Sequence, residues 1–313
     1  MPDAPELSMF SDTTIWPAPA KLNLFLHITG RRADGYHELQ TVFQFLDYGD
    51  ELRFSLREDG QVRRINAVAG VSEADDLVVK AARLLQVETG CTKGVNILLE
   101  KHLPMGGGLG GGSSDAATTL VALNQLWQLN LDEDRLAALG LSLGADVPVF
   151  IRGRAAWAEG VGERLEPIDL PEPWFVVLAP QVNVSTHELF SDPQLTRDDQ
   201  PIKIRDYLLR VAVGGVCGAL FDADSTGVEA GDASEVHNVF EPLVRKKYRE
   251  IDAALTWLTQ FAPARLTGTG ACVFAAFADE SQARHVAEQV GGRWQTIVAA
   301  GCNRSPLYEI ARA

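Results

Sequence analysis

The sequence predicts an α+β protein with two domains, and three observations support this fold class. An apolar, β-branched run at residues 95–99 leads into a glycine-rich loop, and a helical pattern of apolar residues follows at residues 116–127. Strand and helix patterns occur on both sides of Pro171-Glu172-Pro173, which we take as the domain boundary. The chain has 313 residues, so we expect a disordered tail at 1–15 and domains at 16–170 and 171–313.

Composition and charge exclude several classes of protein. The net charge of −14 argues against a nucleic acid or an anionic membrane as partner. An anionic ligand would therefore be held by backbone amides and a few cations, together with a divalent metal. The four cysteines show no CxxC spacing, so the sequence predicts neither a zinc site nor a disulfide framework, which fits a reducing cytoplasm. No apolar run approaches the length of a membrane span, and the N-terminus lacks a signal pattern.

The first domain is expected to be rich in strands. Residues 16–28 predict a strand in which Lys21 and Asn23 share one face. Two polar side chains on an otherwise apolar strand predict that this face lines a polar site. The alternative is an edge strand whose polar face is exposed to solvent. Tyr36 and His37 follow in a turn-rich loop, a pair that by itself has little functional weight. Further elements are strands at residues 40–46, 50–56 and 62–68 and a helix at residues 77–87, capped by Asp75 or Asp76.

The glycine-rich loop at residues 103–115 is the strongest functional signal in the sequence. Six of its residues are glycine, and it opens into a helix through Ser113, Ser114 and Asp115. Glycine has no Cβ, so the backbone can adopt a positive φ and approach a ligand closely. The first N–H groups of a helix lack intrahelical partners and lie at the positive end of the macrodipole. The loop therefore predicts a phosphate site, rather than a flexible linker.

Two known phosphate loops fit this segment poorly. A Walker A loop requires lysine after its last glycine, but Ser113 follows Gly112 here. Gly106, Gly108 and Gly111 do match G-x-G-x-x-G, the dinucleotide pattern. That pattern requires a second strand ending in an acidic residue, whereas an acidic turn at residues 130–134 leads into another helix. The sequence thus indicates a phosphate loop of a different kind.

Beyond the loop, one acidic residue has two interpretations. Asp132 is expected to cap a helix that runs to residue 141. Asp146 is placed at a helix-to-strand junction because Pro148 is expected to stop a helix. Asp146 is then either a turn carboxylate or a catalytic base. The remaining expectations are strands at 155–159, 174–178 and 294–299, and helices at 250–261 and 282–290. We also expect a segment at 183–190 that turns from extended to helical, a Gly/Thr turn at 265–274 and a mobile insertion at 211–236.

Three segments resemble the motifs of the GHMP kinases: residues 19–23, 104–114 and 266–270. Residues 20–24, 33–37 and 143–148 are most similar to the members that act on a cytidine diphosphate-linked methylerythritol. The resemblance implies an N-terminal domain like ribosomal protein S5 domain 2, a ferredoxin-like C-terminal domain and a site in the cleft between them. It also implies ATP and Mg²⁺ as cofactors and a small-molecule substrate.

The resemblance also implies roles for individual residues. Asp146 would accept the proton of the substrate hydroxyl, and Lys21 would polarise that hydroxyl and keep Asp146 charged. Tyr36 and Phe190 would sandwich the cytosine ring, and His37 would contact its edge. Asn23, Lys101 and Thr186 would also contact the substrate. The ATP phosphates would be held by Pro104, Met105, Gly106, Gly107, Gly108, Leu109, Gly110, Gly111, Gly112, Ser113 and Ser114, with Thr267, Gly268, Thr269 and Gly270 near them.

Several alternatives stay open at this point. A homoserine or mevalonate type of GHMP kinase is the nearest, although its substrate has no base to stack on Tyr36 and Phe190. A nucleotide-binding regulator would not need both Lys21 and Asp146, and an NAD-dependent oxidoreductase would need the missing second strand. Asp76 departs from the family, which often has asparagine near the adenine. The metal ligands and the oligomeric state are not implied.

Overall fold

The computed structural model describes residue 10 and residues 13–221 and 236–311, without the side chains of residues 213–221. The tail expected at residues 1–15 and residues 222–235 of the expected insertion thus lie largely outside the described residues. Within these ranges, no helix is both long and apolar enough to cross a membrane.

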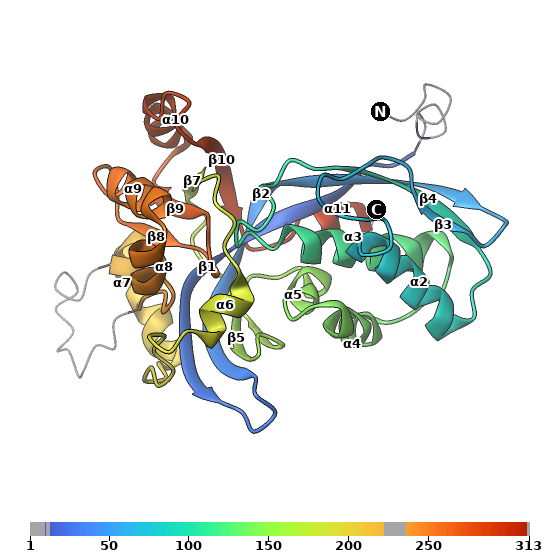
Figure 1. Ribbon diagram of the computed structural model, residues 1–313, viewed down its shortest axis with the longest axis horizontal. Coiled ribbons are helices and arrows are strands. Elements are labelled where there is room, and N and C mark those ends of the chain that lie inside the picture. The colour runs from blue at the N-terminus through green and yellow to red at the C-terminus, as the bar shows by residue number, and fades with distance from the viewer. Residues whose placement is uncertain (1–9, 11–12, 222–235, 312–313) are drawn as a thin grey trace.

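A ten-stranded sheet runs through the whole molecule (Figure 1). Its central path follows the order β3-β4-β2-β10-β7-β9-β8, while β1 and β5 also pair with β2, and β6 pairs with β5. The strands are β1 (Trp16–Arg31), β2 (His37–Arg57), β3 (Val62–Arg64), β4 (Gly94–Glu100), β5 (Ala156–Gly160), β6 (Arg164–Pro167), β7 (Trp174–Ala179), β8 (Ala264–Leu266), β9 (Val273–Phe277) and β10 (Gln295–Cys302).

The helices form two groups (Figure 1). In the figure, α2 to α5 lie together at the right, whereas α8, α9 and α10 lie around β8 and β9 at the left, with α6 between the groups. The helices are α2 (Leu77–Thr89), α3 (Gly111–Leu126), α4 (Glu133–Leu143), α5 (Val147–Arg152), α6 (Thr186–Ser191), α7 (Ile204–Phe221), α8 (Glu241–Lys247), α9 (Arg249–Leu258), α10 (Glu280–Gln289) and α11 (Leu307–Ala311).

The late strand β10 connects the two halves of the sheet. It pairs with β7 along residues 295–300, and its last residues Gly301 and Cys302 pair with Leu46 and Phe45 of β2. The C-terminal helix α11 also packs against α3 and β1. Strands from both sides of Pro171-Glu172-Pro173 therefore share one sheet, and the domain boundary at that position stays a prediction.

The β2 strand differs from the sequence expectation, which divided it into two strands at residues 40–46 and 50–56. Gly49 looks like a turn residue, yet here it lies inside the uninterrupted strand β2, opposite Pro19 of β1 and next to a shift in the pairing register. A Cβ on Gly49 would lie 2.2 Å from the Ala18 carbonyl oxygen. The glycine is therefore needed for a close approach of two strands, and the expectation of a break was wrong.

The expected strand at residues 62–68 is also shorter. The Asn66 side chain takes the place of the backbone hydrogen bonds that would continue β3 along β4. Its side-chain Nδ2 donates to the Leu99 carbonyl at 2.7 Å, and its Oδ1 accepts from the Leu99 N–H at 3.1 Å. These bonds occupy the edge of β4 that a longer β3 would use. The strand consequently ends at Arg64.

The junction at Asp146 was also predicted wrongly, because a helix, α5, follows it rather than a strand. Pro148 lies in the first turn of α5, where the missing N–H has no intrahelical acceptor and the fixed φ suits a helix. Helices α8 and α11 were not predicted at all. Helix α7 extends into the expected insertion at 211–236, and its Tyr207 and Val211, four residues apart, are both buried.

Candidate active site

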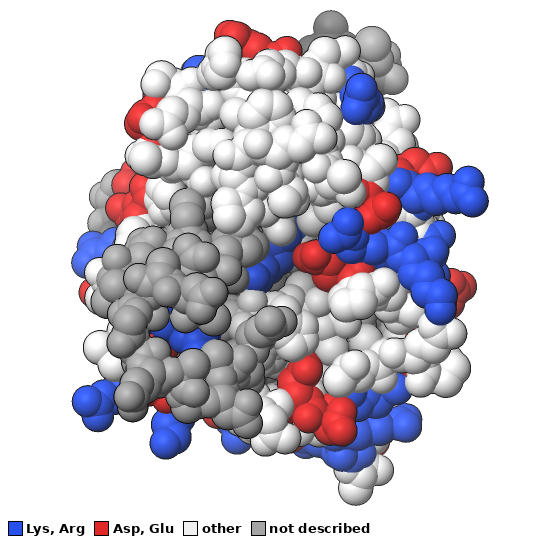
Figure 2. Space-filling view, turned by 90° about the vertical axis from the view of Figure 1, so that its left-hand side faces the viewer, with Lys and Arg blue, Asp and Glu red and all other residues white. Residues whose placement is uncertain are grey.

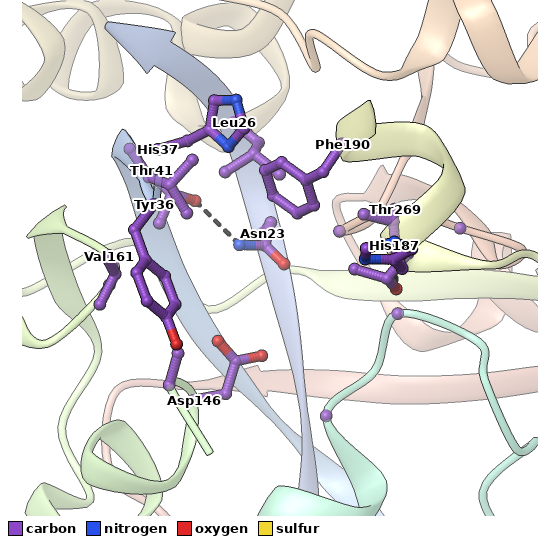
Figure 3. Close-up of a pocket in the computed structure, with 18 of the residues that line it drawn as sticks. Asn23, Leu26, Tyr36, His37, Thr41, Asp146, Val161, His187, Phe190 and Thr269 are labelled. Carbon is purple, nitrogen blue, oxygen red and sulfur yellow. Dashed lines mark hydrogen bonds between the residues drawn. The ribbon is translucent and has the colours of Figure 1, made fainter. Parts of the chain in front are cut away.

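A cavity of about 990 Å³ lies where β1, β2, the glycine loop, the start of α5 and α6 meet (Figure 3). Fourteen of the residues singled out from the sequence line it, and they lie on or beside these segments or on the turn between β8 and β9. They are Lys21, Asn23, Tyr36, His37, Gly106, Gly108, Gly110, Ser113, Asp146, Thr186, Phe190, Gly268, Thr269 and Gly270. The structure thus brings together residues from all three predicted motifs.

Lys21 and Asp146 meet at this cavity. Lys21 is only 3% exposed, and its Nζ lies 3.2 Å from Asp146 Oδ2. The same Nζ donates to Asn23 Oδ1 at 2.5 Å and to the Gly108 carbonyl at 3.1 Å. Asp146 is the N-terminal flanking residue of α5, but its side chain makes no capping bond. Its carboxylate is therefore not committed to the helix and faces both the lysine and the cavity.

Asn23 connects β1 with β2 and the third motif. Its Nδ2 donates to Thr41 Oγ1 at 3.0 Å, the bond drawn in Figure 3. Its backbone N–H donates to Thr267 Oγ1 at 3.0 Å. Lys21 and Asn23 share a face of β1 as predicted, and both are buried, so the alternative of a solvated face was wrong.

The glycine loop is docked on the third motif. The carbonyls of Gly106 and Gly107 accept from the backbone N–H groups of Ala271 and Cys272 at 3.3 and 3.0 Å. Gly108 has a φ of 76°, and a Cβ there would lie 2.2 Å from the Thr267 carbonyl oxygen. Only glycine permits this combination of positive φ and close backbone contact. The third motif therefore shapes the glycine loop.

The first turn of α3 provides free polar groups. The helix starts at Gly111, earlier than the apolar pattern indicated, so both serines belong to its first turn. Ser113 lines the cavity, and Ser114 is fully buried. The Ser114 Oγ has no hydrogen-bond partner among the described atoms. A buried hydroxyl without a partner costs free energy, which a ligand at this turn would recover.

Lys101 does not line the cavity, although the family resemblance implies a substrate contact. Its Nζ lies 2.7 Å from Asp115 Oδ2 and also pairs with Asp50. Asp50 in turn accepts the backbone N–H groups of His102 and Leu103 at 2.6 and 2.8 Å. We call Lys101, Asp50 and Asp115 the anchor triad, because it lies under the start of α3. Burial raises the pKa of Asp115 to about 8, helped by the charge of Asp50 and opposed by Lys101.

The aromatic residues occupy opposite walls of the cavity (Figure 3). Tyr36 is 65% exposed and lies on one wall, with its hydroxyl directed toward Asp146. Phe190 lies on the other wall, where the ring stacked on it is that of His37, with centroids 5.0 Å apart. Phe190 also contacts Phe240 edge-on at 4.9 Å. The sandwich of a base between Tyr36 and Phe190 stays a prediction.

The sequence analysis missed two residues that hold this site. Arg197 lines the cavity and donates from Nε to His37 Nε2 at 3.2 Å. Asn238 is buried, and its Nδ2 donates to the carbonyls of Leu266 and Gly268, both at 2.8 Å. Neither residue belongs to a recognisable motif, and both act over long sequence separations. No local pattern could have identified them.

Eight further residues that the sequence analysis placed near the phosphates lie outside the cavity lining. They are Pro104, Met105, Gly107, Leu109, Gly111, Gly112, Ser114 and Thr267. Leu109 and Thr267 are buried, and the Leu109 carbonyl accepts the Lys21 backbone N–H at 3.0 Å. On the face drawn in Figure 2, the described Lys and Arg side chains are interspersed with Asp and Glu.

Comparison with known proteins identifies the family. Residues 76–154 match the model described as GHMP kinases N terminal domain, and residues 223–295 match GHMP kinases C terminal. A relative from Pseudomonas paraeruginosa (strain DSM 24068 / PA7), named 4-diphosphocytidyl-2-C-methyl-D-erythritol kinase, is 57% identical over 292 residues. The match covers 93% of this chain and 95% of the relative. The chain belongs to the GHMP kinase family.

Solved structures agree with this assignment. A 4-(cytidine 5'-diphospho)-2C-methyl-D-erythritol kinase is 32% identical to this GHMP kinase, with a TM-score of 0.77 and coverage of 92% of this chain and 99% of that one. A homoserine kinase from Cytophaga hutchinsonii ATCC 33406 gives a TM-score of 0.66 at 17% identity, covering 94% and 96%, which shows a shared fold alone. The family and the α+β fold class expected from the sequence are confirmed.

Asp76 has a structural role in this GHMP kinase. Its Oδ1 accepts the Val78 N–H at 3.0 Å as the cap of α2, and its Oδ2 pairs with the buried Arg64 guanidinium. Of the two caps considered, Asp75 and Asp76, the second is correct. Both carboxylate oxygens of Asp76 are thus engaged within the protein.

Proposed function

We propose that this chain transfers the γ-phosphoryl group of ATP to the 2-hydroxyl of 4-diphosphocytidyl-2-C-methyl-D-erythritol. This reaction belongs to the non-mevalonate route to isoprenoid precursors. The contact that carries the proposal is the Lys21–Asp146 ion pair, 3.2 Å long, in the cavity where the glycine loop and the aromatic wall meet. The high identity to relatives with this name supports the choice of substrate.

Asp146 is proposed as the general base. Its carboxylate takes the proton of the substrate hydroxyl as that oxygen forms a bond to the γ-phosphorus, while the bond to the β–γ bridging oxygen breaks and ADP leaves. Lys21 stabilises the negative charge that develops on the attacking oxygen. Phosphoryl transfer depends mainly on positioning and on charge stabilisation. A buried cation held by three oxygen atoms meets both needs.

The glycine loop is proposed to hold the ATP phosphates. Gly106, Gly108 and Gly110 all have positive φ and line the cavity, so their backbone can approach an anion without a Cβ in the way. The start of α3 adds unpaired N–H groups and the positive end of a helix dipole. GHMP kinases use ATP, which agrees with this placement.

Mg²⁺ is proposed as the metal cofactor, and the residues present fit it. The hydroxyl of Ser113 faces the cavity, and the buried Ser114 Oγ and Asp115 Oδ1 lack partners among the described atoms. Oxygen ligands of this kind, together with nucleotide phosphates, suit Mg²⁺. When bound, the ion would neutralise phosphate charge. We propose that Ser113, whose hydroxyl group faces the cavity, would hold it.

The cytidine end is proposed to bind between the two walls that carry Tyr36 and Phe190. A base offers a flat face for stacking, and the edge of the base offers hydrogen bonds that discriminate between bases. His37, Asn23 and Thr186 lie around this part of the cavity. A homoserine or mevalonate type of substrate has no base, so it would leave the aromatic wall without a function.

A coupled assay of ADP release tests the proposal directly. The purified chain is supplied with ATP and with the cytidyl substrate, homoserine or mevalonate in parallel reactions. We expect turnover only with the cytidyl substrate, and ³¹P NMR of the product should show a new phosphomonoester. Turnover with homoserine or mevalonate, and none with the cytidyl compound, would contradict the proposed substrate. The assignment to the GHMP kinase family would still stand.

A further inference from the structure

Arg197 is locked in place on the aromatic wall of the cavity. Its Nη2 donates to the carbonyls of Phe190 and Asp192 at 2.8 and 2.7 Å, and its Nη1 donates to the Leu195 carbonyl at 2.9 Å. These acceptors lie at the end of α6 and in the turn that follows. A guanidinium group is planar, so fixing its two outer nitrogens also fixes the direction of the Nε–H bond.

The fixed Nε–H points at His37. Arg197 Nε lies 3.2 Å from His37 Nε2, across a separation of 160 residues in the sequence. Arg197 can only donate, so Nε2 of His37 must present its lone pair. The neutral imidazole then carries its proton on Nδ1. Burial, the charge of Arg197 and the charge of Arg31 all lower the pKa of His37, which favours this neutral form.

The second nitrogen of His37 is available to a ligand. In Figure 3, one ring nitrogen is directed down toward Asn23 and the other is directed away from it. With Nε2 bonded to Arg197, the nitrogen toward the cavity is Nδ1, the one that carries the proton. The ring itself is held by stacking on Phe190. The site therefore presents one oriented N–H donor, beside an aromatic wall.

We infer that Arg197 is a positioning residue that makes the site select cytosine over uracil, by holding His37 as the donor at Nδ1. This inference rests on the proposed function. The N3 atom of cytosine has a lone pair and accepts a hydrogen bond, whereas N3 of uracil carries a hydrogen. A fixed N–H donor forms a hydrogen bond with N3 of cytosine but faces the N3–H group of uracil, and such a mismatch lowers the affinity for uracil.

Calorimetry with CMP and UMP tests this selection. Wild-type protein should bind CMP at least tenfold more tightly than UMP. Arg197→Lys keeps the positive charge but loses the planar fork and Nε–H, so the CMP:UMP preference should fall at least fivefold, with ATP KM within twofold of wild type. Arg205→Lys, an exposed arginine on α7, is the matched control and should change neither value. An unchanged preference in Arg197→Lys would overturn the inference.

A double-mutant cycle separates positioning from simple bracing of α6. If Arg197 acts through His37, Arg197→Lys should have little further effect on the CMP:UMP preference in a His37→Ala background. If the double variant loses CMP:UMP preference by the product of the two single losses, Arg197 acts independently of His37, by bracing α6, and the inference fails. ¹⁵N NMR of the imidazole gives a second readout, with the His37 signal assigned by its loss in His37→Ala. The wild type should show a proton on Nδ1 and Arg197→Lys should show a mixture of tautomers.

The same experiments distinguish this inference from the proposed function. If wild-type protein turns over the cytidyl substrate but Arg197→Lys keeps the full CMP:UMP preference, the inference fails and the proposed function stands. If wild-type protein binds neither CMP nor the cytidyl substrate, both the selection and the proposed function fail. A change of tautomer in Arg197→Lys together with a loss of CMP preference supports the inference.

Discussion

Lys21 and Asp146 form an ion pair in which one partner is buried and the other faces the cavity. The side chain of Lys21 is 3% exposed and that of Asp146 is 34% exposed, with 3.2 Å between Nζ and Oδ2. Lys21 also donates to two uncharged acceptors, Asn23 Oδ1 and the Gly108 carbonyl, so two of its hydrogen bonds persist when Asp146 is replaced. An isosteric, uncharged replacement at Asp146 therefore removes the carboxylate while it leaves these hydrogen bonds of Lys21 in place.

The first prediction follows from this asymmetry. Asp146→Asn should lower kcat by about 10²–10⁴, the usual contribution of a general base. The thermal midpoint and the affinity for ATP should be nearly unchanged, because the replacement is almost isosteric. Asp169→Asn, which changes an exposed carboxylate paired with Arg154, is the matched control and should keep full activity. Wild-type turnover in Asp146→Asn would remove this residue from the mechanism.

The second prediction concerns the phosphate loop. Gly108→Ala places a Cβ 2.2 Å from the Thr267 carbonyl at a φ of 76°, so the loop must move away from the third motif. ATP affinity, measured by calorimetry, should fall at least tenfold while the fold persists. Gly30→Ala is the control, because its Cβ would meet only Glu38 Cβ at 4.0 Å. Equal ATP affinity in Gly108→Ala and Gly30→Ala would show that the ATP phosphates do not bind at the glycine loop.

The third prediction concerns the pH dependence of stability. The pKa of Asp115 is about 8 in the folded protein and 3.8 in the reference state, so the unfolded chain releases its proton first as the pH rises. The contribution of Asp115 to the free energy of unfolding should fall between about pH 4 and pH 8 and stay constant above that range. The amide side chain of the Asp115→Asn variant cannot lose a proton, so the variant lacks this pH-dependent contribution to the free energy of unfolding.

Urea unfolding of wild type and Asp115→Asn from pH 5 to pH 9 measures the effect. The variant should gain stability relative to wild type as the pH rises toward 8, and the difference should then level off. Burial lowers the pKa of Lys101, but Asp115 and Asp50 together raise it beyond its ordinary value, so Lys101 titrates above this window. A difference that does not vary with pH would show that Asp115 is already charged at low pH.

The fourth prediction concerns the aromatic wall. Tyr36→Ala should raise the KM for the cytidyl substrate about tenfold or more, since loss of one stacking partner costs about 1–3 kcal/mol per base. The KM for ATP and the thermal midpoint should change little, because Tyr36 is 65% exposed. Phe190→Ala should raise the same KM but also lower stability, because Phe190 packs on His37 and Phe240.

The double variant and a competition assay complete this test. The double variant Tyr36→Ala, Phe190→Ala should lose less affinity for the cytidyl substrate than the sum of the two single losses. A base that stacks on one aromatic ring alone is already bound weakly. Free CMP should compete with the cytidyl substrate and not with ATP. Competition by CMP against ATP alone would contradict the assignment of this wall to the base.

The sequence by itself determined the local chemistry of this protein. The strand, glycine loop and helix of this segment were predictable because all three are encoded by neighbouring residues. Lys21 and Asn23 were assigned to one face of β1 by the alternation of a strand alone. The resemblance to the GHMP kinases followed from three short segments, and the comparison with relatives confirmed it.

Only the tertiary structure decided how distant segments complete the site. Gly49 marks a close approach to β1 rather than a turn, Lys101 is held within the anchor triad, and Arg197 meets His37 from 160 residues away. Each outcome depends on which backbone or charge lies opposite the residue after the sheet has formed. Local periodicity records which face a side chain occupies, but it contains no information about the partner that packing brings to that face.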